Sequence, residues 1–304
     1  MESRLIQGNT YVLDLGILDL PYYKINETDI ILLDTGYMKD HREKLAEFFT
    51  ANRLQVKGIL CSHAHIDHVG NAQFFKEKYG ALVAMAQEEA NIVHSTLGLK
   101  IFYSTYPLSK VEEHYGHMVV QTDLPISSQE TSVTLCGVTF ELLHTPGHSI
   151  GHMVITTPDK VSYLGDALIS EDVMASAKMP YAYLLKEDLA SKVSLYALKS
   201  DWYVLAHKGV YPDIRDLITD NIYFYRQRAE EVLRLVTEKM TQEDILKAAA
   251  KTMGFRVGSI NKYLVVERML RSYLDYLVET GKLILTLDAG FLKYINPNER
   301  NMED

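Results

Sequence analysis

The sequence predicts an α/β fold, because buried strands alternate with single helices along its first part. Apolar runs at residues 30–33, 58–61 and 81–85 are typical of strands, and segments with helical spacing separate them at 41–49 and 71–79. This order of strand, helix and strand is the pattern of α/β proteins.

Further strands and two long interruptions complete the first part of the chain. Short strands are expected at 11–15 and 22–26, before the first helix. Residues 87–128 lose the strand pattern and are rich in Tyr and His, and a second interruption at 166–200 carries a helix near 187–199. Long excursions of this kind commonly shape a site. Strands return at 133–135, 138–143, 153–157, 161–164 and 202–205.

A change of pattern at about residue 215 predicts a boundary between two domains, 1–214 and 215–304. Helix is nearly continuous from there, beginning with an apolar stripe over 222–240. This region holds equal numbers of basic and acidic residues, interleaved as on a solvated helix face and unlike a phosphate-binding track. Its expected role is dimerisation or closure of a pocket.

The remaining elements of this region predict a winged-helix-like arrangement. Thr241 opens a second helix with a capping-box pattern, and Ser259 opens a third helix that Gly281 ends. Strands at 283–287 and 291–295 flank an Asp-Ala-Gly turn and form a hairpin.

Composition and charge narrow the class of protein. The 304 residues are 47% hydrophobic and 23% charged, which excludes disordered and collagen-like chains. A net charge of −9 repels polyanions and argues against a dedicated nucleic-acid binder. The start of the chain lacks a signal-peptide pattern, no apolar run approaches a membrane span, and two cysteines require no oxidising compartment, so a cytoplasmic location is expected.

The densest chemical signal is a cluster of histidines directly after the strand at 58–61. His63, His65, Asp67 and His68 lie within six positions at a strand end. Neutral imidazole and carboxylate groups suit zinc, iron or manganese, so a divalent metal explains their convergence. A chance cluster on a solvated loop is disfavoured, because the chain has only 11 histidines.

Other potential ligands follow three later strands. His148 lies in a Thr-Pro-Gly-His-Ser turn, Asp166 follows the strand at 161–164, and His207 follows the strand at 202–205. Such strand ends are where parallel and mixed sheets place their sites.

This order of motifs, preceded by Asp34-Thr35-Gly36, resembles the metallo-β-lactamase superfamily of binuclear metal hydrolases over about residues 1–210. The resemblance implies a four-layer αβ/βα sandwich and two divalent metal ions, expected to be zinc, with iron and manganese as alternatives. Residues 215–304 resemble, by pattern alone, the winged-helix region of the lactamase-B2-like branch.

The resemblance also implies a division of the ligands between the two metals. One metal is expected at His63, His65 and His148, and the second at Asp67, His68 and His207. Asp166 is expected to bridge the two, and Asp67 is also the candidate catalytic residue. Asp34 is either a residue that orients ligands or a turn former.

Two features of the motifs leave alternatives open. Lys208 stands in Ala-His-Lys-Gly where the family commonly has Gly-His-Gly, and it either points to solvent, which we favour, or contacts an anionic substrate. Ser149 lies in a Gly-x-Ser-x-Gly pattern typical of serine hydrolases. That pattern needs a helix after the serine, whereas residues 153–157 predict a strand.

Several residues near these motifs are expected to have lesser roles. His144 and His152 are expected to be hydrogen-bonded supports. Candidates for lining a substrate pocket come from the two excursions, namely His94, His114, His117, Tyr103, Tyr106, Tyr115, Tyr181 and Tyr183.

The expected function is hydrolysis of a small ester, thioester or lactone by a metal-bridging hydroxide. One alternative is a phosphodiesterase or ribonuclease of the lactamase-B2 kind, which the acidic balance disfavours. A second is an iron-dependent oxygen or persulfide enzyme. The expected partners are a small-molecule substrate and, in a homodimer, a second copy of the chain, with neither a membrane nor nucleic acid as the main partner.

Overall fold

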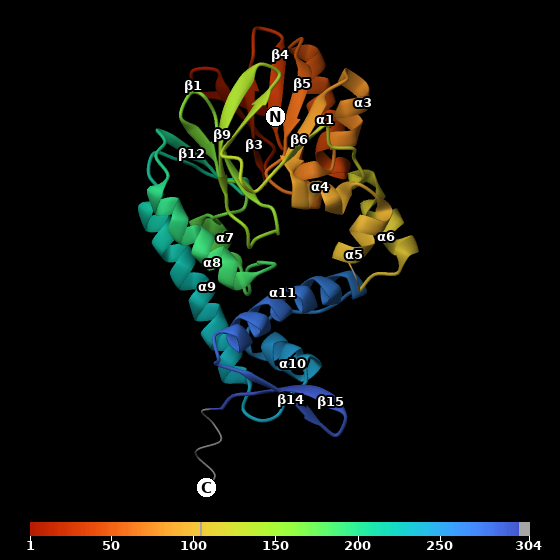
Figure 1. The fold of residues 1–304 in the computed structure, drawn as a ribbon, viewed down its shortest axis with the longest axis vertical. Coiled ribbons are helices and arrows are strands. Elements are labelled where there is room, and N and C mark those ends of the chain that lie inside the picture. Colours follow the sequence, from red (N-terminus) through yellow and green to blue (C-terminus); the bar gives the residue numbers. More distant parts are fainter. Residues whose placement is uncertain (104, 298–304) are drawn as a thin grey trace.

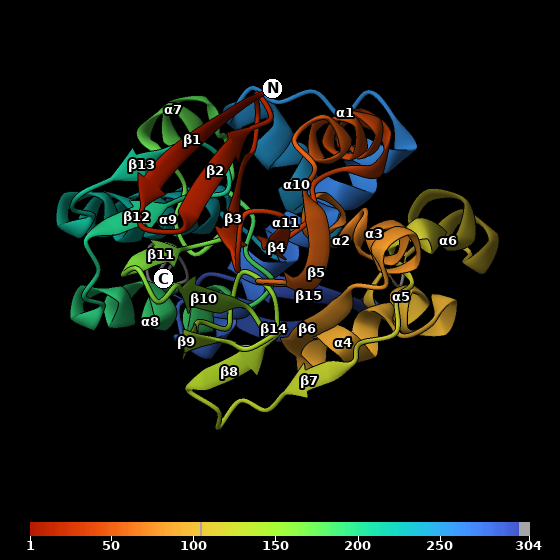
Figure 2. The ribbon, with the colours of Figure 1, turned by 90° about the horizontal axis from the view of Figure 1, so that it is seen from above.

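A computed structural model describes residues 1–103 and 105–297. Over these residues the first part of the chain stacks in four layers, with two sheets face to face and helices on both outer sides (Figure 1). Seen from above, α1 (Met38–Ala51) and α3 (Ala72–Tyr79) flank the sheets on one side, and α8 (Leu185–Ser194) and α9 (Arg215–Leu235) flank them on the other (Figure 2). The predicted four-layer α/β sandwich is confirmed.

The first sheet follows the order of the chain and is antiparallel up to β4 and parallel from there on. Its strands are β1 (Glu2–Gln7), β2 (Thr10–Asp14), β3 (Asp19–Lys24), β4 (Asp29–Leu33), β5 (Gln55–Leu60), β6 (Leu82–Ala86) and β7 (Leu124–Ile126). The parallel connections carry α1 (Met38–Ala51), α2 (Ile66–Val69) and α3 (Ala72–Tyr79).

The excursion after β6 is helical before the chain returns to the sheet at β7. It contains α4 (Gln87–Val93), α5 (Thr96–Phe102), α6 (Leu108–Tyr115) and a 3₁₀ turn, η1 (Gly116–Met118).

The second sheet has the order β13, β12, β11, β10, β9, β8, in which only β11 and β12 are parallel. Its strands are β8 (Ser132–Leu135), β9 (Val138–His144), β10 (Met153–Thr156), β11 (Val161–Tyr163), β12 (Trp202–Val204) and β13 (Val210–Tyr211). The second excursion contains α7 (Glu171–Ser176), α8 (Leu185–Ser194) and η2 (Leu195–Ala197).

Strict alternation along the buried strands produces the layers. In β4, Ile30 and Leu32 pack under α1 and α3, while Ile31 and Leu33 face the second sheet. In β10, Ile155 faces the first sheet and Val154 packs against the outer helices. The two sheets therefore share one hydrophobic core between them. The outer face of each sheet packs against helices around a second hydrophobic core.

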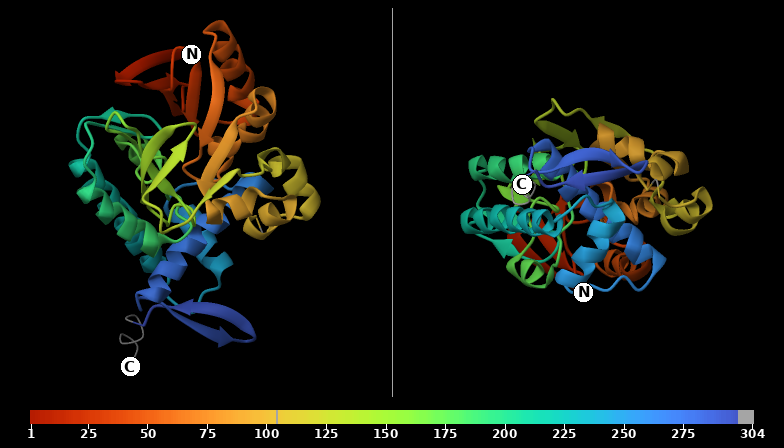
Figure 3. Two further views of the ribbon diagram at one scale, coloured as in Figure 1. Left: turned by 45° about the horizontal axis from the view of Figure 1, so that its top comes forward. Right: turned by 90° about the horizontal axis from the view of Figure 1, so that it is seen from below.

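Residues after 214 form helices and a hairpin, as predicted. They are α9 (Arg215–Leu235), α10 (Gln242–Thr252), α11 (Ile260–Glu279), β14 (Ile284–Asp288) and β15 (Phe291–Ile295). The hairpin lies at the end of the molecule away from the N-terminus (Figure 3). Residues 298–304 of the predicted 215–304 domain lie outside the described residues.

The helix α11 crosses beneath the first part of the chain, between α5 and α8 (Figure 1). Tyr106 Oη donates to Asn261 Oδ1 at 3.3 Å, and Ser272 Oγ accepts from the Leu185 amide at 3.1 Å. Its N-cap Ser259 and the Thr241 capping box of α10 occur as predicted.

Several boundaries differ from the sequence prediction. The helix expected at 222–240 is α9, which begins at Arg215 and ends at Leu235. The strand β1 was not predicted, because its side chains are partly or fully exposed and show no buried alternation. Among the described residues, no helix is long and apolar enough to span a membrane.

Candidate metal centre

The histidine cluster lies where the chain leaves the first sheet after β5. His63 and His65 belong to the turn that follows the strand, and Asp67 and His68 belong to the short helix α2. The amide of Ser62 donates to Asp34 Oδ1 at 2.7 Å, and the carbonyl of Ser62 accepts from the Met153 amide at 2.9 Å. The turn is therefore held by both sheets.

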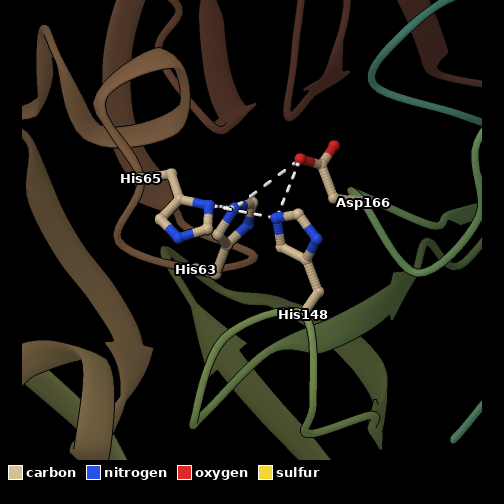
Figure 4. Close-up of side chains that lie close together, drawn as sticks. All are labelled: His63, His65, His148 and Asp166. Atoms are coloured by element: carbon tan, nitrogen blue, oxygen red, sulfur yellow. Dashed lines mark hydrogen bonds and ion pairs between the residues drawn. The ribbon is translucent and has the colours of Figure 1, made fainter. Parts of the chain in front are cut away.

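Three imidazoles and one carboxylate meet in the first group (Figure 4). His65 Nδ1 lies 2.9 Å from His63 Nε2 and 3.0 Å from His148 Nε2. His148 Nε2 lies 3.1 Å from Asp166 Oδ2. These four residues come from three separate strand ends, and their ring nitrogens and carboxylate oxygen point at one another.

A second group lies beside the first. Asp67 Oδ2 lies 3.2 Å from His207 Nε2 and 3.6 Å from His68 Nε2. Asp166 faces both groups, because its carboxylate also lies 3.6 Å from His68 Nε2 and 3.6 Å from His207 Nε2. The structure thus brings together all seven predicted ligands, in the two predicted sets.

The donor atoms of this centre fit metal ions. Within each group, one ligand atom per residue lies within 4.8 Å of all the others. His68 Nε2 and Asp166 Oδ1 are buried and have no hydrogen-bond partner among the described residues. Unpaired buried polar atoms are costly, and a cation between the groups would satisfy both.

Charge around the centre favours bound cations. The carboxylate of Asp166 raises the pKa of His207 to about 10 against the opposing effect of burial. Burial lowers the pKa of His68, but Asp67, Asp166 and Asp34 outweigh it and raise the pKa above its usual range. By contrast, burial and neighbouring imidazoles lower the pKa of His63, which favours the neutral ring that metals bind.

Asp34 orients the ligands, which decides between its two predicted roles. Its Oδ2 accepts hydrogen bonds from His68 Nδ1 at 2.7 Å, Ser62 Oγ at 2.6 Å and Tyr163 Oη at 2.7 Å. With Nδ1 held in this way, His68 directs Nε2 toward Asp67 and Asp166. Asp34 has a φ of 68°, so it also turns the chain.

Glu89 of α4 joins the two ligand-bearing loops and was missed by sequence reasoning. Its buried carboxylate accepts from the Ala64 amide at 2.8 Å, Ser149 Oγ at 2.6 Å and the Gly151 amide at 2.7 Å. The first donor lies between His63 and His65, and the other two follow His148. No local sequence pattern distinguishes this glutamate from others on helices.

The loop that carries His148 also rests on α8. The carbonyl of Gly147 accepts from the Leu184 amide at 2.9 Å, and Ser191 Oγ donates to the carbonyl of Pro146 at 2.6 Å. A Cβ on Gly147 would lie 2.1 Å from the Asp188 amide nitrogen, so only glycine fits. Asp188 itself forms a buried ion pair with Lys192 at 2.5 Å.

Two of the other histidines and Lys208 lie as the sequence predicts. His152 accepts from the Asp166 amide at 3.1 Å, and His144 Nε2 lies 2.9 Å from the Glu130 carbonyl oxygen, so both are hydrogen-bonded supports as predicted. Lys208 is exposed and lies in a surface pocket beside Asp19, as favoured.

The serine-hydrolase alternative fails on structure. Ser149 is followed by the strand β10, not by a helix, and its hydroxyl donates a hydrogen bond to Glu89. The family pattern is therefore the better interpretation of this loop.

A cavity of about 470 Å³ contacts the centre through His148, Asp166 and His207. Tyr181 lines it, with its ring centroid 5.3 Å from that of His148, and burial raises the pKa of Tyr181 to about 12. The candidates from the first excursion do not line this cavity, so their place in a substrate pocket stays a prediction: His94, His114, His117, Tyr103, Tyr106 and Tyr115. Tyr183 does not line it either.

Comparison with known proteins agrees with this geometry. Residues 5–207 match the family model described as the metallo-beta-lactamase superfamily. Hydroxyacylglutathione hydrolase GloC of Haemophilus influenzae is 25% identical over 195 residues, covering 62% of this chain and 84% of that protein. A linear primary-alkylsulfatase of Pseudomonas is 24% identical over 290 residues, covering 82% of this chain and 50% of that protein.

Solved structures share the fold over nearly the whole chain. A metallo-beta-lactamase family protein of Thermus thermophilus superposes with a TM-score of 0.70 at 22% identity, covering 95% of this chain and 98% of that one. A beta-lactamase domain protein of Burkholderia ambifaria gives a TM-score of 0.70 at 17% identity, covering 97% and 93%. The match to the family model spans well over half of this chain. The chain therefore belongs to the metallo-beta-lactamase superfamily and is a metal-dependent hydrolase.

Proposed function

We propose that the protein hydrolyses a small ester, thioester or lactone at a pair of divalent metal ions. The observation that carries this proposal is the convergence of seven imidazole and carboxylate side chains, with His68 Nε2 and Asp166 Oδ1 buried and unpartnered between the two groups. In this proposal His63, His65 and His148 would hold one ion. Asp67, His68 and His207 would hold the other, and Asp166 would serve both.

The metal pair would supply a water of lowered pKa and a Lewis acid for the substrate carbonyl. The chain's own residues would do the rest. Asp34 fixes the ring of His68, and Glu89 fixes the loops on either side of the first group. We assign Asp67 as the catalytic carboxylate, because its Oδ2 lies 3.2 Å from His207 Nε2 and 3.6 Å from His68 Nε2 and would hold, with these two rings, the ion that activates the water.

Zinc is the metal we propose for both positions. Nitrogen and carboxylate ligands suit zinc, and one structure with the same fold is described as a di-zinc class B3 metallo-beta-lactamase, LRA-12, at a TM-score of 0.53. The thioester substrate class draws support from the likeness to hydroxyacylglutathione hydrolase, whose name describes a thioester cleavage.

We also propose that residues 1–214 are the catalytic domain and that residues 215–304 are a winged-helix-like region of the lactamase-B2-like branch. The boundary is supported by the helix α9, which begins at Arg215, and the second part by its helices and terminal hairpin. The described residues of the second part also pack around a hydrophobic core that includes Tyr225, Leu270 and Leu277.

The test is a hydrolysis screen of the zinc-loaded protein against activated esters, thioesters and lactones. His65→Ala should lower kcat/KM by at least about a hundredfold, since removing a metal ligand removes stabilisation made in the transition state. His94→Ala is the matched control, because His94 is exposed and outside both groups, and it should retain full activity. Equal activity of the two variants would contradict the proposal.

Two further arms separate the alternatives from the hydrolase proposal. Cleavage of single-stranded RNA with no turnover of esters would favour phosphodiester chemistry. Stoichiometric iron in the purified protein, with oxygen consumption or persulfide turnover, would favour a redox enzyme. Neither result is expected from a zinc esterase or thioesterase.

A further inference from the structure

The cavity beside the metal centre extends well beyond the ligands themselves. Of its lining residues, His148, Asp166 and His207 belong to the two ligand groups, so a molecule in the cavity reaches both. Its volume of about 470 Å³ is within the range of small-molecule sites, about 300–1,000 Å³. The proposed reaction at the metals leaves the rest of this space without a role.

Two parts of the chain that are far apart in sequence wall the cavity. Val173 and Met179 come from the second excursion, and Val265 and Met269 come from α11. Phe255 lies in the segment that precedes α11. The C-terminal region therefore supplies one side of the wall, mainly from α11, whose ribbon lies beneath the first part of the chain (Figure 1).

Away from the metal ligands, the wall offers few polar groups. Tyr225 Oη is already engaged, because it donates to the carbonyl of Tyr181 at 3.2 Å. Lys178 and Lys262 are exposed, so their ammonium groups reach solvent. Tyr181 Oη is buried without a hydrogen-bond partner among the described residues, so it offers one hydrogen bond at the end of the cavity beside His148. Along the rest of the wall, a polar substituent would lose hydrogen bonds to water and find little in exchange, whereas an apolar one would gain from burial.

Building on the proposed hydrolysis, we propose that the substrate is an ester or thioester with an extended apolar chain, and that this chain lies in the cavity while the scissile carbonyl lies at the metals. Hydrolysis adds water across the acyl bond, releasing a carboxylic acid and an alcohol or thiol, and needs no other reactant. The chain belongs either to the acyl part or to the alcohol part of the substrate.

The test measures kcat/KM for p-nitrophenyl esters with acetyl, butyryl, hexanoyl, octanoyl and decanoyl groups. Each methylene moved from water into the cavity should raise kcat/KM by about threefold to fourfold until the space is filled. A parallel series of alkyl acetates, from ethyl to decyl, identifies the side that carries the chain. The same kcat/KM for all chain lengths in both series would overturn the inference and leave hydrolysis intact.

Filling the cavity should abolish the chain-length effect. Val265→Trp adds bulk at the wall, and it should lower the ratio of decanoyl to acetyl turnover by at least about tenfold. Val193→Trp is the matched control. Val193 on α8 is 50% exposed and Val265 on α11 is 38% exposed, so both are partly exposed valines on helices, but Val193 lies outside this cavity. An unchanged ratio in Val265→Trp would overturn the inference.

Direct binding separates this inference from the proposed function. Decanoate should bind the zinc-loaded protein in calorimetry at least about tenfold more tightly than acetate, and Val265→Trp should remove the difference. If this holds while no ester is hydrolysed, the cavity assignment stands and the hydrolase proposal fails. If esters are hydrolysed and decanoate binds no better than acetate, the reverse conclusion follows.

Discussion

The carboxylate of Asp34 accepts a hydrogen bond from His68 Nδ1 at 2.7 Å, across 34 residues of sequence. The same carboxylate holds the backbone of Ser62, which precedes the first ligand. One buried side chain at the end of β4 thus fixes both the orientation of a ligand ring and the path of the ligand loop. The centre depends on residues that would not themselves contact a metal.

Replacing this carboxylate should weaken metal binding. In Asp34→Asn one carboxylate oxygen becomes an amide nitrogen, which donates. The side chain can then no longer accept all three hydrogen bonds from His68 Nδ1, the Ser62 amide and Ser62 Oγ. Zinc affinity should fall about 10–100-fold, the usual effect of losing a partner that orients a metal ligand. Competition with a chromophoric chelator measures this. Asp40→Asn, an exposed change on α1, should bind zinc like the unaltered protein.

Glu89→Gln tests the connection between the two ligand loops. Glu89 is 1% exposed, and its carboxylate accepts three hydrogen bonds, which an amide of the same size cannot all accept. The free energy of unfolding should fall by about 1–3 kcal/mol, and zinc affinity should fall with it. Urea denaturation and zinc titration measure the two effects.

The exposed substitution Glu43→Gln is the control for this variant. If Glu89→Gln matched Glu43→Gln in both stability and zinc affinity, the loops would be held by other contacts.

The seven candidate ligands could be predicted from sequence because each follows a buried strand. Strand ends are recognised from local apolar runs. His63 follows a strand of the first sheet, whereas His148 and His207 follow strands of the second, and the stacking of the two sheets brings the ligands near one another. Glu89 could not be predicted, because its role arises only when α4 packs beside two loops that are distant in sequence. Closure of a pocket by residues 215–304 was expected, but the lining residues could not be named from sequence, since Val265 reaches the cavity only through the packing of α11.

Boundaries were predicted less well where exposed or polar residues form regular structure. The strand β1 has no buried alternation, and α9 begins with the charged residues Arg215 and Asp216, although its buried apolar side already starts at Leu217 and Ile218. The strand β7 is only three residues long and lies within an excursion that is otherwise helical. Pairing with β6 determines that strand, and its own sequence does not.

The buried ion pair behind the His148 loop predicts a large effect on stability. Lys192 and Asp188 are 1% and 2% exposed, and the ammonium lies 2.5 Å from the carboxylate. Lys192→Met leaves Asp188 buried without its partner, which should cost about 3–5 kcal/mol of unfolding free energy. Replacing both residues, with Asp188→Leu added, should recover most of the loss, as measured by urea denaturation.

Lys186→Met provides the control on the same helix, because Lys186 is exposed and its contact with Glu279 is long, at 3.8 Å. Its unfolding free energy should change by no more than about 0.5 kcal/mol. A similarly small change in Lys192→Met would show that the buried pair contributes nothing to stability.

Alanine substitutions at two glycines with similar φ values distinguish backbone strain from steric clash with neighbouring atoms. A Cβ on Gly165 would lie 2.7 Å from His152 Nε2 and 2.9 Å from Ser62 Oγ, whereas a Cβ on Gly80 would meet nothing within 4 Å. Their φ values are +50° and +67°, so alanine should cost about 1 kcal/mol through strain at either position.

Only Gly165→Ala should also disturb the metal centre, because Gly165 precedes Asp166. Its zinc affinity should fall at least about tenfold, while Gly80→Ala should bind zinc normally. Zinc titration followed by calorimetry distinguishes the two variants. Equal zinc affinities would mean that the backbone beside Asp166 adjusts freely.

We propose that these side chains bind a pair of metal ions, and a calorimetric titration of zinc into protein stripped with a chelator tests this binding. We predict binding of about two zinc ions per chain, and about one after His148→Ala, with hydrolytic activity restored only as zinc is added. Binding of no zinc, or activity that persists in the stripped protein, would contradict the account.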